Sequence, residues 1–203
     1  DYHNEHSDLS DLDFIFGKKK EIDLLKTPFS FMMEEKEATR KTNATFLNHI
    51  SREIPYFIGG SADLSTSVKS YIDRGNDLTK DNYLGKNIWF GVREHAMGAI
   101  LNGLALTNFQ VFGSTFLTFS DYLKPAIRMS SLMKLPVIYL LSHDSIEIGS
   151  DGPTHQPVEQ LAMLRSEPNL NVYRPCDGKE LLGCWNHILK EKEKPSALIL
   201  SKV

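Results

Sequence analysis

Glu94 stands at the point where an apolar run over residues 87–92 gives way to a helical pattern. An acid in the first turn of a helix favours the helix dipole, and this is the ordinary structural use of such a residue. Its neighbours include Gly91, Val92 and Met97, which offer few polar partners. A carboxyl group in an apolar setting can also share a proton with a nitrogen atom of a ligand. On the residues alone, both interpretations of Glu94 stay open.

Phe116, Phe119 and Tyr122 recur at intervals of three positions after the next apolar run. On a helical turn, this spacing would place the three rings on one face. Such a face is either a stripe of the hydrophobic core or a wall on which a flat heteroaromatic ring can stack. The segment is therefore a candidate binding surface for an aromatic ligand as well as a packing element.

A glycine-rich loop over residues 143–157 carries His143, Asp151 and His155. A loop with two histidines and several acids seldom serves packing alone. The spacing of these residues matches no zinc motif, so hydrogen bonding to a polyhydroxylated substrate is the better interpretation. Arg40 lies in a separate helical pattern, where it is either a surface residue or a clamp for an anion.

Short apolar runs alternate with helical patterns from residue 37 onward. Strands are expected over residues 56–62, 87–92, 110–114, 136–142, 170–175 and 196–201, and helices over 37–54, 94–107, 119–133, 158–166 and 178–192. This alternation predicts a three-layer α/β/α sandwich around a mostly parallel sheet of about six strands. In such folds the sites lie beyond the carboxyl ends of the strands. The acid, the aromatic residues and the two histidines all follow strands, so we expect them at one edge of the sheet.

The bulk composition excludes several classes of function. The chain has 203 residues, of which 41% are hydrophobic and 24% charged, as in a soluble globular domain. Its formal net charge of -3 gives no basic field for nucleic acid, and no apolar run is long enough to span a bilayer. The glycine fingerprints of dinucleotide-binding and phosphate-loop proteins and the serine elbow of hydrolases are missing from the sequence. Cys176 and Cys184 fit neither a redox pair nor a zinc knuckle, so a reducing, cytoplasmic location is expected.

Residues 1–36 differ from the rest because they are charged and irregular, with an isolated apolar patch at 29–33. Low periodicity and high polarity favour an arm or linker from a preceding domain, with the apolar patch docked on another surface. His3 and His6 are interpreted as an exposed pair rather than a metal site. We therefore divide the chain into an arm over residues 1–36 and an α/β domain over residues 37–203.

A series of short sequences follows the order in which they occur in the transketolase family: ATRK, GGSADL, GVREHAMGAI, STFLTFSDY, HDSI, DGPTHQPVEQLA, YRPCDG and SALILS. The chain resembles the pyrimidine-binding middle domain of that family over about residues 37–203. The combination of DGPTHQP with REHAM is highly specific for this resemblance. Other thiamine enzymes, such as 1-deoxy-xylulose-5-phosphate synthase and the beta subunits of 2-oxo-acid dehydrogenases, share only the DGPTH element. GGSADL and ATRK favour transketolase or its close relative dihydroxyacetone synthase. A module of another thiamine enzyme, or a non-catalytic pairing subunit, is the alternative.

The resemblance implies that thiamine diphosphate is the cofactor and that Glu94 hydrogen-bonds a nitrogen of its pyrimidine ring. Phe116, Phe119 and Tyr122 match the aromatic pocket around that ring, and Asp63 lies where the family approaches the thiazolium ring. In such enzymes the cofactor carries the chemistry and the protein orients and tunes it. The resemblance therefore makes Glu94 a catalytic residue as well as a cofactor-binding one.

The resemblance also implies contacts with sugar phosphates of the xylulose 5-phosphate and ribose 5-phosphate class. His143 and Asp151 match residues that contact hydroxyl groups of the donor sugar. His155 matches a histidine near the reacting carbons, so both histidines are expected to be catalytic. Arg40 and Ser67 match residues that bind the sugar phosphate.

Lys202 stands where the family has an arginine that helps to hold the substrate phosphate. A lysine offers a point charge without the two-pronged fork of arginine, so we expect looser phosphate capture at this corner. Glu147 and Ser150 also depart from the usual IGxGEDG pattern of the loop and move an acid along it.

The resemblance implies that this chain is one domain of a longer polypeptide. In the family, a separate N-terminal domain holds the diphosphate and a Mg²⁺ or Ca²⁺ ion through a GDG-type motif that this sequence lacks. The active site there forms across the interface of a homodimer. We therefore expect the 203 residues alone to be inactive. We also expect them to bind thiamine diphosphate weakly or not at all, and to self-associate through the apolar helix that begins at Glu94.

Overall fold

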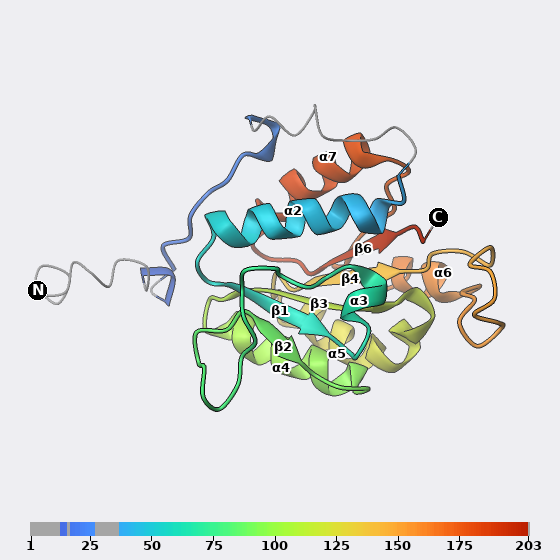
Figure 1. Ribbon diagram of the computed structural model, residues 1–203, viewed down its shortest axis with the longest axis horizontal. Helices are drawn as coiled ribbons and strands as arrows, with labels where there is room; N and C mark the ends of the chain where they lie inside the picture. Colours follow the sequence, from blue (N-terminus) through green and yellow to red (C-terminus); the bar gives the residue numbers. More distant parts are fainter. Residues whose placement is uncertain (1–12, 16, 27–36, 203) are drawn as a thin grey trace, which may run out of the picture.

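Six short strands form one sheet in which every neighbouring pair is parallel (Figure 1). The computed structural model describes residues 13–15, 17–26 and 37–202. The strands are β1 Phe57–Ser61, β2 Asn87–Trp89, β3 Gln110–Phe116, β4 Ile138–Ser142, β5 Asn171–Tyr173 and β6 Ser196–Leu200. Across the sheet their order is β2, β1, β3, β4, β6, β5. The prediction of a parallel sheet is confirmed.

Helices cover both faces of the sheet and complete three layers (Figure 1). One face carries α2 (Thr39–Glu53) and α7 (Gly178–Ile188), and the other carries α4 (Glu94–Leu106), α5 (Ser120–Leu132) and α6 (Gln160–Arg165). The short helical turns include η2 (Leu24–Lys26), α3 (Ser65–Val68) and η4 (Leu117–Phe119), and residues 13–15 form a further 3-10 turn. The predicted α/β/α sandwich is therefore confirmed.

Two hydrophobic clusters fill the spaces between the layers. Phe46 and Trp185 belong to the cluster under α2 and α7, whereas Met97 and Leu123 belong to the cluster under α4 and α5. Every residue of the central strands β4 and β6 is buried. Parallel strands covered on both faces need such continuous apolar runs, and this explains why the sequence shows runs there rather than alternation.

A glycine in β3 allows α4 to approach the sheet closely. A Cβ atom at Gly113 would lie 2.4 Å from Leu101 Cδ1 and 3.2 Å from Met97 Sδ. A side chain at this position would therefore push α4 away from the strand. The close contact fixes α4, and with it Glu94 in its first turn, against β3.

Part of the predicted arm packs on the domain. Phe14 is buried and stacks on Tyr56, with the ring centroids 4.5 Å apart. Leu24 is fully buried, and its backbone N–H donates to Asn186 Oδ1 at 3.1 Å. Neither contact was expected from the sequence, because an irregular segment shows no periodic apolar face.

The three aromatic residues at the end of β3 and beyond it do not share one helix. Phe116 ends β3, Phe119 lies in η4 and Tyr122 lies in α5, so the expectation that the three rings share a helical turn is wrong. The strand runs two residues further than the apolar pattern indicated, and a 3-10 turn separates it from the helix. The apolar patch at 29–33 and the pair His3 and His6 lie outside the described residues.

Candidate active site

The loops that follow the strands meet at the carboxyl edge of the sheet, because all the strands point the same way. A cavity of about 410 Å³ opens at this edge. It is lined by Ala62, Asp63, Leu64, Val92, Glu94, Phe119 and Tyr122. Three of the predicted strand-end segments therefore come together around one space.

Glu94 occupies the first turn of α4 and is only 7% exposed. The hydroxyl of Thr115, a buried residue of β3, donates to Glu94 Oε1 at 3.3 Å. Ala62 and Val92 add apolar side chains to the cavity lining beside Glu94. A carboxyl group held in this way is suited to a single well-oriented hydrogen bond with a ligand.

The aromatic rings form a continuous row despite their different elements. Phe119 lies 6.2 Å from Tyr122 between ring centroids and 5.7 Å from Phe116, which it meets nearly parallel at 14°. Phe119 and Tyr122 line the cavity, whereas Phe116 lies behind them and stacks on His143 at 3.7 Å. Tyr122 is 65% exposed, which is unusual for a large aromatic side chain and leaves its ring accessible. The two cavity-lining rings of Phe119 and Tyr122, taken together with the carboxyl group of Glu94 in the same lining, are called the aromatic wall.

Asp63 also lines the cavity and has a positive φ of 64°. Left-handed backbone is uncommon for residues other than glycine, although aspartate tolerates it better than most. The backbone N–H of the following residue, Leu64, donates to Ser61 Oγ at 3.0 Å and so supports this turn. Asp63 and Glu94 therefore line the same cavity.

His143 follows β4 directly and is 2% exposed. Its Nδ1 lies 2.9 Å from Ser142 Oγ, and its φ is 62°. Burial, and then the positive charges of Arg40 and Lys202, lower the pKa of His143 to about 4. The ring is therefore neutral at physiological pH and can donate or accept one hydrogen bond at its second nitrogen.

His155 lies at the other end of the same loop. Its ring meets Phe119 edge-on at 5.2 Å and Phe116 at 5.9 Å. Its Nδ1 lies 2.8 Å from Thr154 Oγ1. Both histidines therefore contact Phe116, and the loop over residues 143–157, called the histidine loop below, begins and ends beside the aromatic row.

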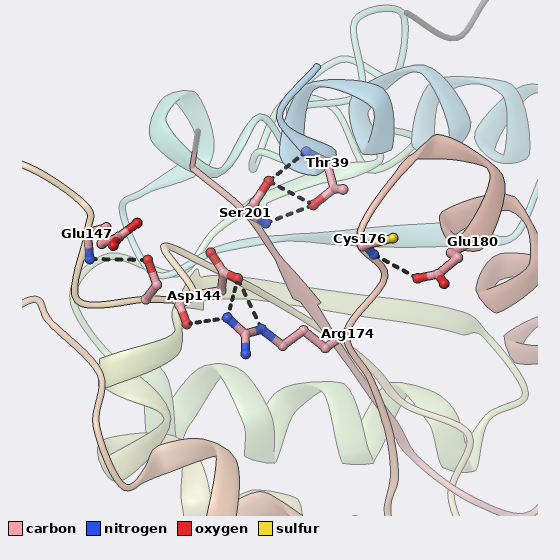
Figure 2. Close-up of polar contacts among 8 residues, drawn as sticks. Thr39, Asp144, Glu147, Arg174, Cys176, Glu180 and Ser201 are labelled. Atoms are coloured by element: carbon pink, nitrogen blue, oxygen red, sulfur yellow. Dashed lines mark hydrogen bonds and ion pairs between the residues drawn. The ribbon is translucent and has the colours of Figure 1, made fainter. Parts of the chain in front are cut away.

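Arg40 lies at the start of α2, where its Nη1 donates to the carbonyl oxygen of Ser67 at 2.7 Å. Burial lowers the pKa of Arg40, and the charge of Asp151 opposes that change. The end of β6 fixes the start of this helix, because Ser201 N–H donates to Thr39 Oγ1 at 2.7 Å and Thr39 N–H donates to Ser201 Oγ at 2.9 Å (Figure 2). Arg40 and Ser67 are thus neighbours in the structure.

Lys202 forms hydrogen bonds with two residues of the histidine loop. Its ammonium group donates to the carboxylate of Asp151 and to the carbonyl oxygen of Ile148. The hydrogen bond from Lys202 lowers the pKa of Asp151, so this carboxylate stays ionised at neutral pH. A phosphate that approaches Lys202 must therefore compete with Asp151.

The described residues of the site suit an aromatic ring better than a metal ion. The aromatic wall, with its buried carboxyl group and stacking rings, fits a flat heterocycle that carries a ring nitrogen. In contrast, no group of three His, Cys, Asp or Glu residues in the part of the chain that the structure describes could hold a metal ion. None of the helices there combines the length and apolar character needed to cross a membrane.

Comparison with known proteins agrees with this geometry. Residues 35–203 match the family described as transketolase, pyrimidine binding domain. The chain belongs to this family. It is 51% identical over 174 residues to the transketolase of Halalkalibacterium halodurans, which covers 85% of this chain and 26% of the relative. It is 53% identical over 166 residues to the transketolase of Bacillus subtilis, covering 81% and 25%.

Solved structures of transketolases share the fold. A variant of the Pichia stipitis enzyme in complex with fructose 6-phosphate superposes with a TM-score of 0.91 at 36% identity, covering 100% of this chain and 31% of that one. The Leishmania mexicana enzyme gives a TM-score of 0.88 at 40% identity, covering 94% and 28%. The chain thus spans about a quarter to a third of the length of these transketolases.

Some residues that shape the site were missed by sequence reasoning. Thr115 supports Glu94 from the neighbouring strand, and Arg174 binds Asp144 beside His143. Both contacts join segments whose proximity depends on the order of the strands in the sheet. The only available signal was the family resemblance of the segments STFLTFSDY and YRPCDG, which assigned them no such role.

Proposed function

We propose that this chain is the pyrimidine-binding domain of a longer, thiamine-diphosphate-dependent transketolase. The complete enzyme would transfer a two-carbon glycolaldehyde unit from a ketose phosphate to an aldose phosphate. The observation that carries the proposal is the aromatic wall, where a buried glutamate and two rings face one cavity. Relatives that are about half identical over most of this chain bear the name transketolase.

In this proposal Glu94 hydrogen-bonds a nitrogen of the pyrimidine ring and holds a proton there. Thr115 orients the carboxyl group, while Phe119 and Tyr122 stack on the ring and exclude water from it. When bound, thiamine diphosphate supplies the nucleophilic carbon that a polypeptide lacks. Asp63, which also lines the cavity, would contact the second ring of the cofactor.

The histidine loop serves the sugar in this proposal. His143 and Asp151 hydrogen-bond hydroxyl groups of the donor, and His155 lies near the reacting carbons. Arg40, Ser67 and Lys202 bind the phosphate of the sugar. The Pichia stipitis relatives were solved with fructose 6-phosphate and with sedoheptulose 7-phosphate, which supports sugar phosphates as the substrate class.

The complete protein needs more than these residues. We propose that another domain holds the diphosphate and a Mg²⁺ or Ca²⁺ ion, since this chain spans only about a quarter of the length of its transketolase relatives. We also propose a homodimer, since Ile100 and Leu106 of α4 and Leu132 of α5 leave apolar side chains exposed. Free Cys176 and Cys184 fit a reducing cytoplasm, where the enzyme would serve pentose phosphate metabolism.

The test compares this chain with the complete protein. Both are titrated with thiamine diphosphate and Mg²⁺ and assayed with xylulose 5-phosphate plus ribose 5-phosphate, with identification of the products. Sedoheptulose 7-phosphate formed by the complete protein, and no turnover by the 203-residue chain, would support the proposal. Formation of 1-deoxy-xylulose 5-phosphate from pyruvate would refute it, and so would turnover by this chain alone.

A further inference from the structure

One side-chain amide joins the end of the histidine loop to the helix that carries Tyr122. Gln160 is the first residue of α6 and is only 3% exposed. Its Nε2 donates to Asp121 Oδ2 at 2.9 Å, and its Oε1 accepts from the backbone N–H of Val158 at 2.9 Å. Asp121 lies in the first turn of α5, next to Tyr122, and Val158 directly follows the loop. The amide of Gln160 therefore bridges the two regions of the site.

The two partners of Gln160 determine which way its amide points. A backbone N–H only donates a hydrogen bond, and a carboxylate oxygen only accepts one. A carboxamide satisfies both partners because it carries a donor and an acceptor on one rigid plane. A buried polar side chain needs such partners, since the loss of its contact with water is otherwise uncompensated. The bridge thus depends on the chemistry of residue 160 and not only on its size.

Other contacts hold the histidine loop at different points. Lys202 binds Asp151 in the middle of the loop, and Gln156 Nε2 donates to the carbonyl oxygen of Ile146 at 2.8 Å. Neither of these two contacts joins the loop to an element of the aromatic wall. The amide of Gln160 makes that connection, because its carboxylate partner lies on α5.

The bridge lies close along the chain to two rings that meet. His155 shortly precedes Val158, and Phe119 shortly precedes Asp121. The rings of His155 and Phe119 meet edge-on, with their centroids 5.2 Å apart. Gln160 therefore ties together the two segments that carry these rings, and its loss would free one segment to move relative to the other.

We propose that Gln160 is a positioning residue, which acts through Val158 and Asp121 to hold His155 against the aromatic wall. This inference rests on the proposed function in one respect, namely that His155 lies near the reacting carbons of the sugar. The wall itself packs on buried strands, so the loss of the bridge should displace the loop and leave the wall in place. Such a displacement should lower kcat without weakening the binding of the cofactor.

The first experiment needs no activity. Imidazole NMR signals of the 203-residue chain are recorded for the parent protein and for Gln160→Leu and Gln160→Glu, with His155→Gln to assign the His155 signals. Gln160→Leu removes both hydrogen bonds, whereas Gln160→Glu keeps an acceptor for Val158 and places a second carboxylate beside Asp121. We expect the His155 signals to shift in both variants, because the ring current of Phe119 acts on them through the geometry of the two rings.

Two further variants make the test specific. Asn171→Asp is the matched control, because Asn171 Nδ2 also donates to a carboxylate, Glu191 Oε2 at 3.3 Å, but at the start of β5 and so at the amino edge of the sheet. This control should leave the imidazole signals of the loop unchanged. The double variant Gln160→Glu with Asp121→Asn reverses the pair, since an amide on α5 then donates to a carboxylate on α6. It should restore the parent signals.

The second experiment measures steady-state kinetics of the complete enzyme. We expect Gln160→Leu and Gln160→Glu to lower kcat roughly tenfold to a hundredfold, because a group misplaced by about 1 Å can cost that much. The apparent affinity for thiamine diphosphate should stay unchanged, since Gln160 does not line the cavity of the aromatic wall. The double variant should recover most of the lost kcat, and Asn171→Asp should match the parent enzyme.

The outcomes separate the inference from the proposed function. Unchanged His155 signals in both Gln160→Leu and Gln160→Glu would overturn the positioning role, whatever the kinetics show. Shifted signals that the double variant does not restore would overturn the part assigned to Asp121. A kcat that falls in His155→Gln but not in the Gln160 variants would also overturn the inference.

Two further results would support the positioning role. Shifted signals with an unchanged kcat in the Gln160 variants and in His155→Gln would support it and refute the place of His155 near the reacting carbons. Shifted signals with a lowered kcat in all of these variants would support both the positioning role and the proposed function.

Discussion

The aromatic wall and the histidine loop meet at one edge of the sheet but are held in place differently. Glu94, Phe119 and Tyr122 lie in helical turns that pack on buried strands, and Glu94 is supported by Thr115 of β3. The histidine loop contains no described helix or strand between residues 143 and 157. It is held instead by charged side chains from distant parts of the chain, such as Lys202, which lies 51 positions beyond Asp151.

Because of this difference, the two regions should respond differently to pH and to salt. Packing holds the wall, so its geometry should depend little on pH and salt. Ion pairs and a buried histidine hold the loop, so its geometry should respond to both. Changes in the wall should therefore affect the cofactor, and changes in the loop should affect the sugar.

The most severe break in the wall is Glu94→Gln. The amide cannot take up or give up a proton, so we expect kcat of the complete enzyme to fall by about 10²–10⁴-fold, the usual contribution of general acid–base groups. Glu193→Gln, which alters an exposed glutamate, should leave kcat unchanged. Near-normal activity of Glu94→Gln with correct folding by circular dichroism would remove Glu94 from the mechanism.

The loop should make stability dependent on pH. Burial lowers the pKa of His143 to about 4, below its unfolded value near 6.5. The charged and titratable groups that act on His143 are Arg40, Lys202, Asp151 and His155. Between these values the unfolded state binds the additional proton, so the free energy of unfolding should fall as pH falls from 6.5 to 4, by up to roughly 3 kcal/mol.

Urea unfolding of the 203-residue chain at several pH values measures this effect, with His143→Gln as the comparison. The lowered pKa of Asp151 acts in the same direction at lower pH, because its ion pair is lost only when acid below its ordinary pKa of 3.8 neutralises the carboxylate. His143→Gln should therefore flatten only part of the profile. Equal pH profiles for the two proteins would mean that His143 titrates normally.

A milder change in the wall is Phe119→Ala. Removing the stacking ring should weaken thiamine diphosphate binding by about 1 kcal/mol, or roughly fivefold in its apparent affinity for the complete enzyme. Tyr83→Ala is the control, because Tyr83 is an exposed ring outside the cavity lining. A change in donor KM without a change in cofactor affinity would place Phe119 on the sugar side instead.

The smallest effect is expected from Lys202→Arg. The arginine fork can bind a phosphate while keeping a contact with Asp151, so the KM for phosphorylated sugars should fall by roughly twofold to fivefold. Unphosphorylated hydroxypyruvate provides the control substrate, and its KM should not change. An equal change for both substrates would show that residue 202 acts through the loop rather than through phosphate.

The fold could be predicted from the sequence because the alternation of apolar runs and helical patterns records local burial. The same pattern placed Glu94 and His143 at the ends of strands, and strand ends gather at one edge of a parallel sheet. The pattern does not encode strand order, so it could not show that Arg174 would reach Asp144 across β6. Nor could it show that Lys202 is bound by Asp151 rather than free for a ligand.

The docking of Phe14 and Leu24 bears on how this domain should be produced in the laboratory. Composition suggests a cut at residue 37, but such a shortened chain would lose two fully or nearly fully buried apolar side chains. Burying one large apolar side chain contributes about 1.5–3 kcal/mol, so the cut would remove a considerable part of the stability of a small domain. It would also expose Tyr56 and Phe109, which Phe14 covers, and so favour aggregation. An expression clone should therefore begin before Phe14.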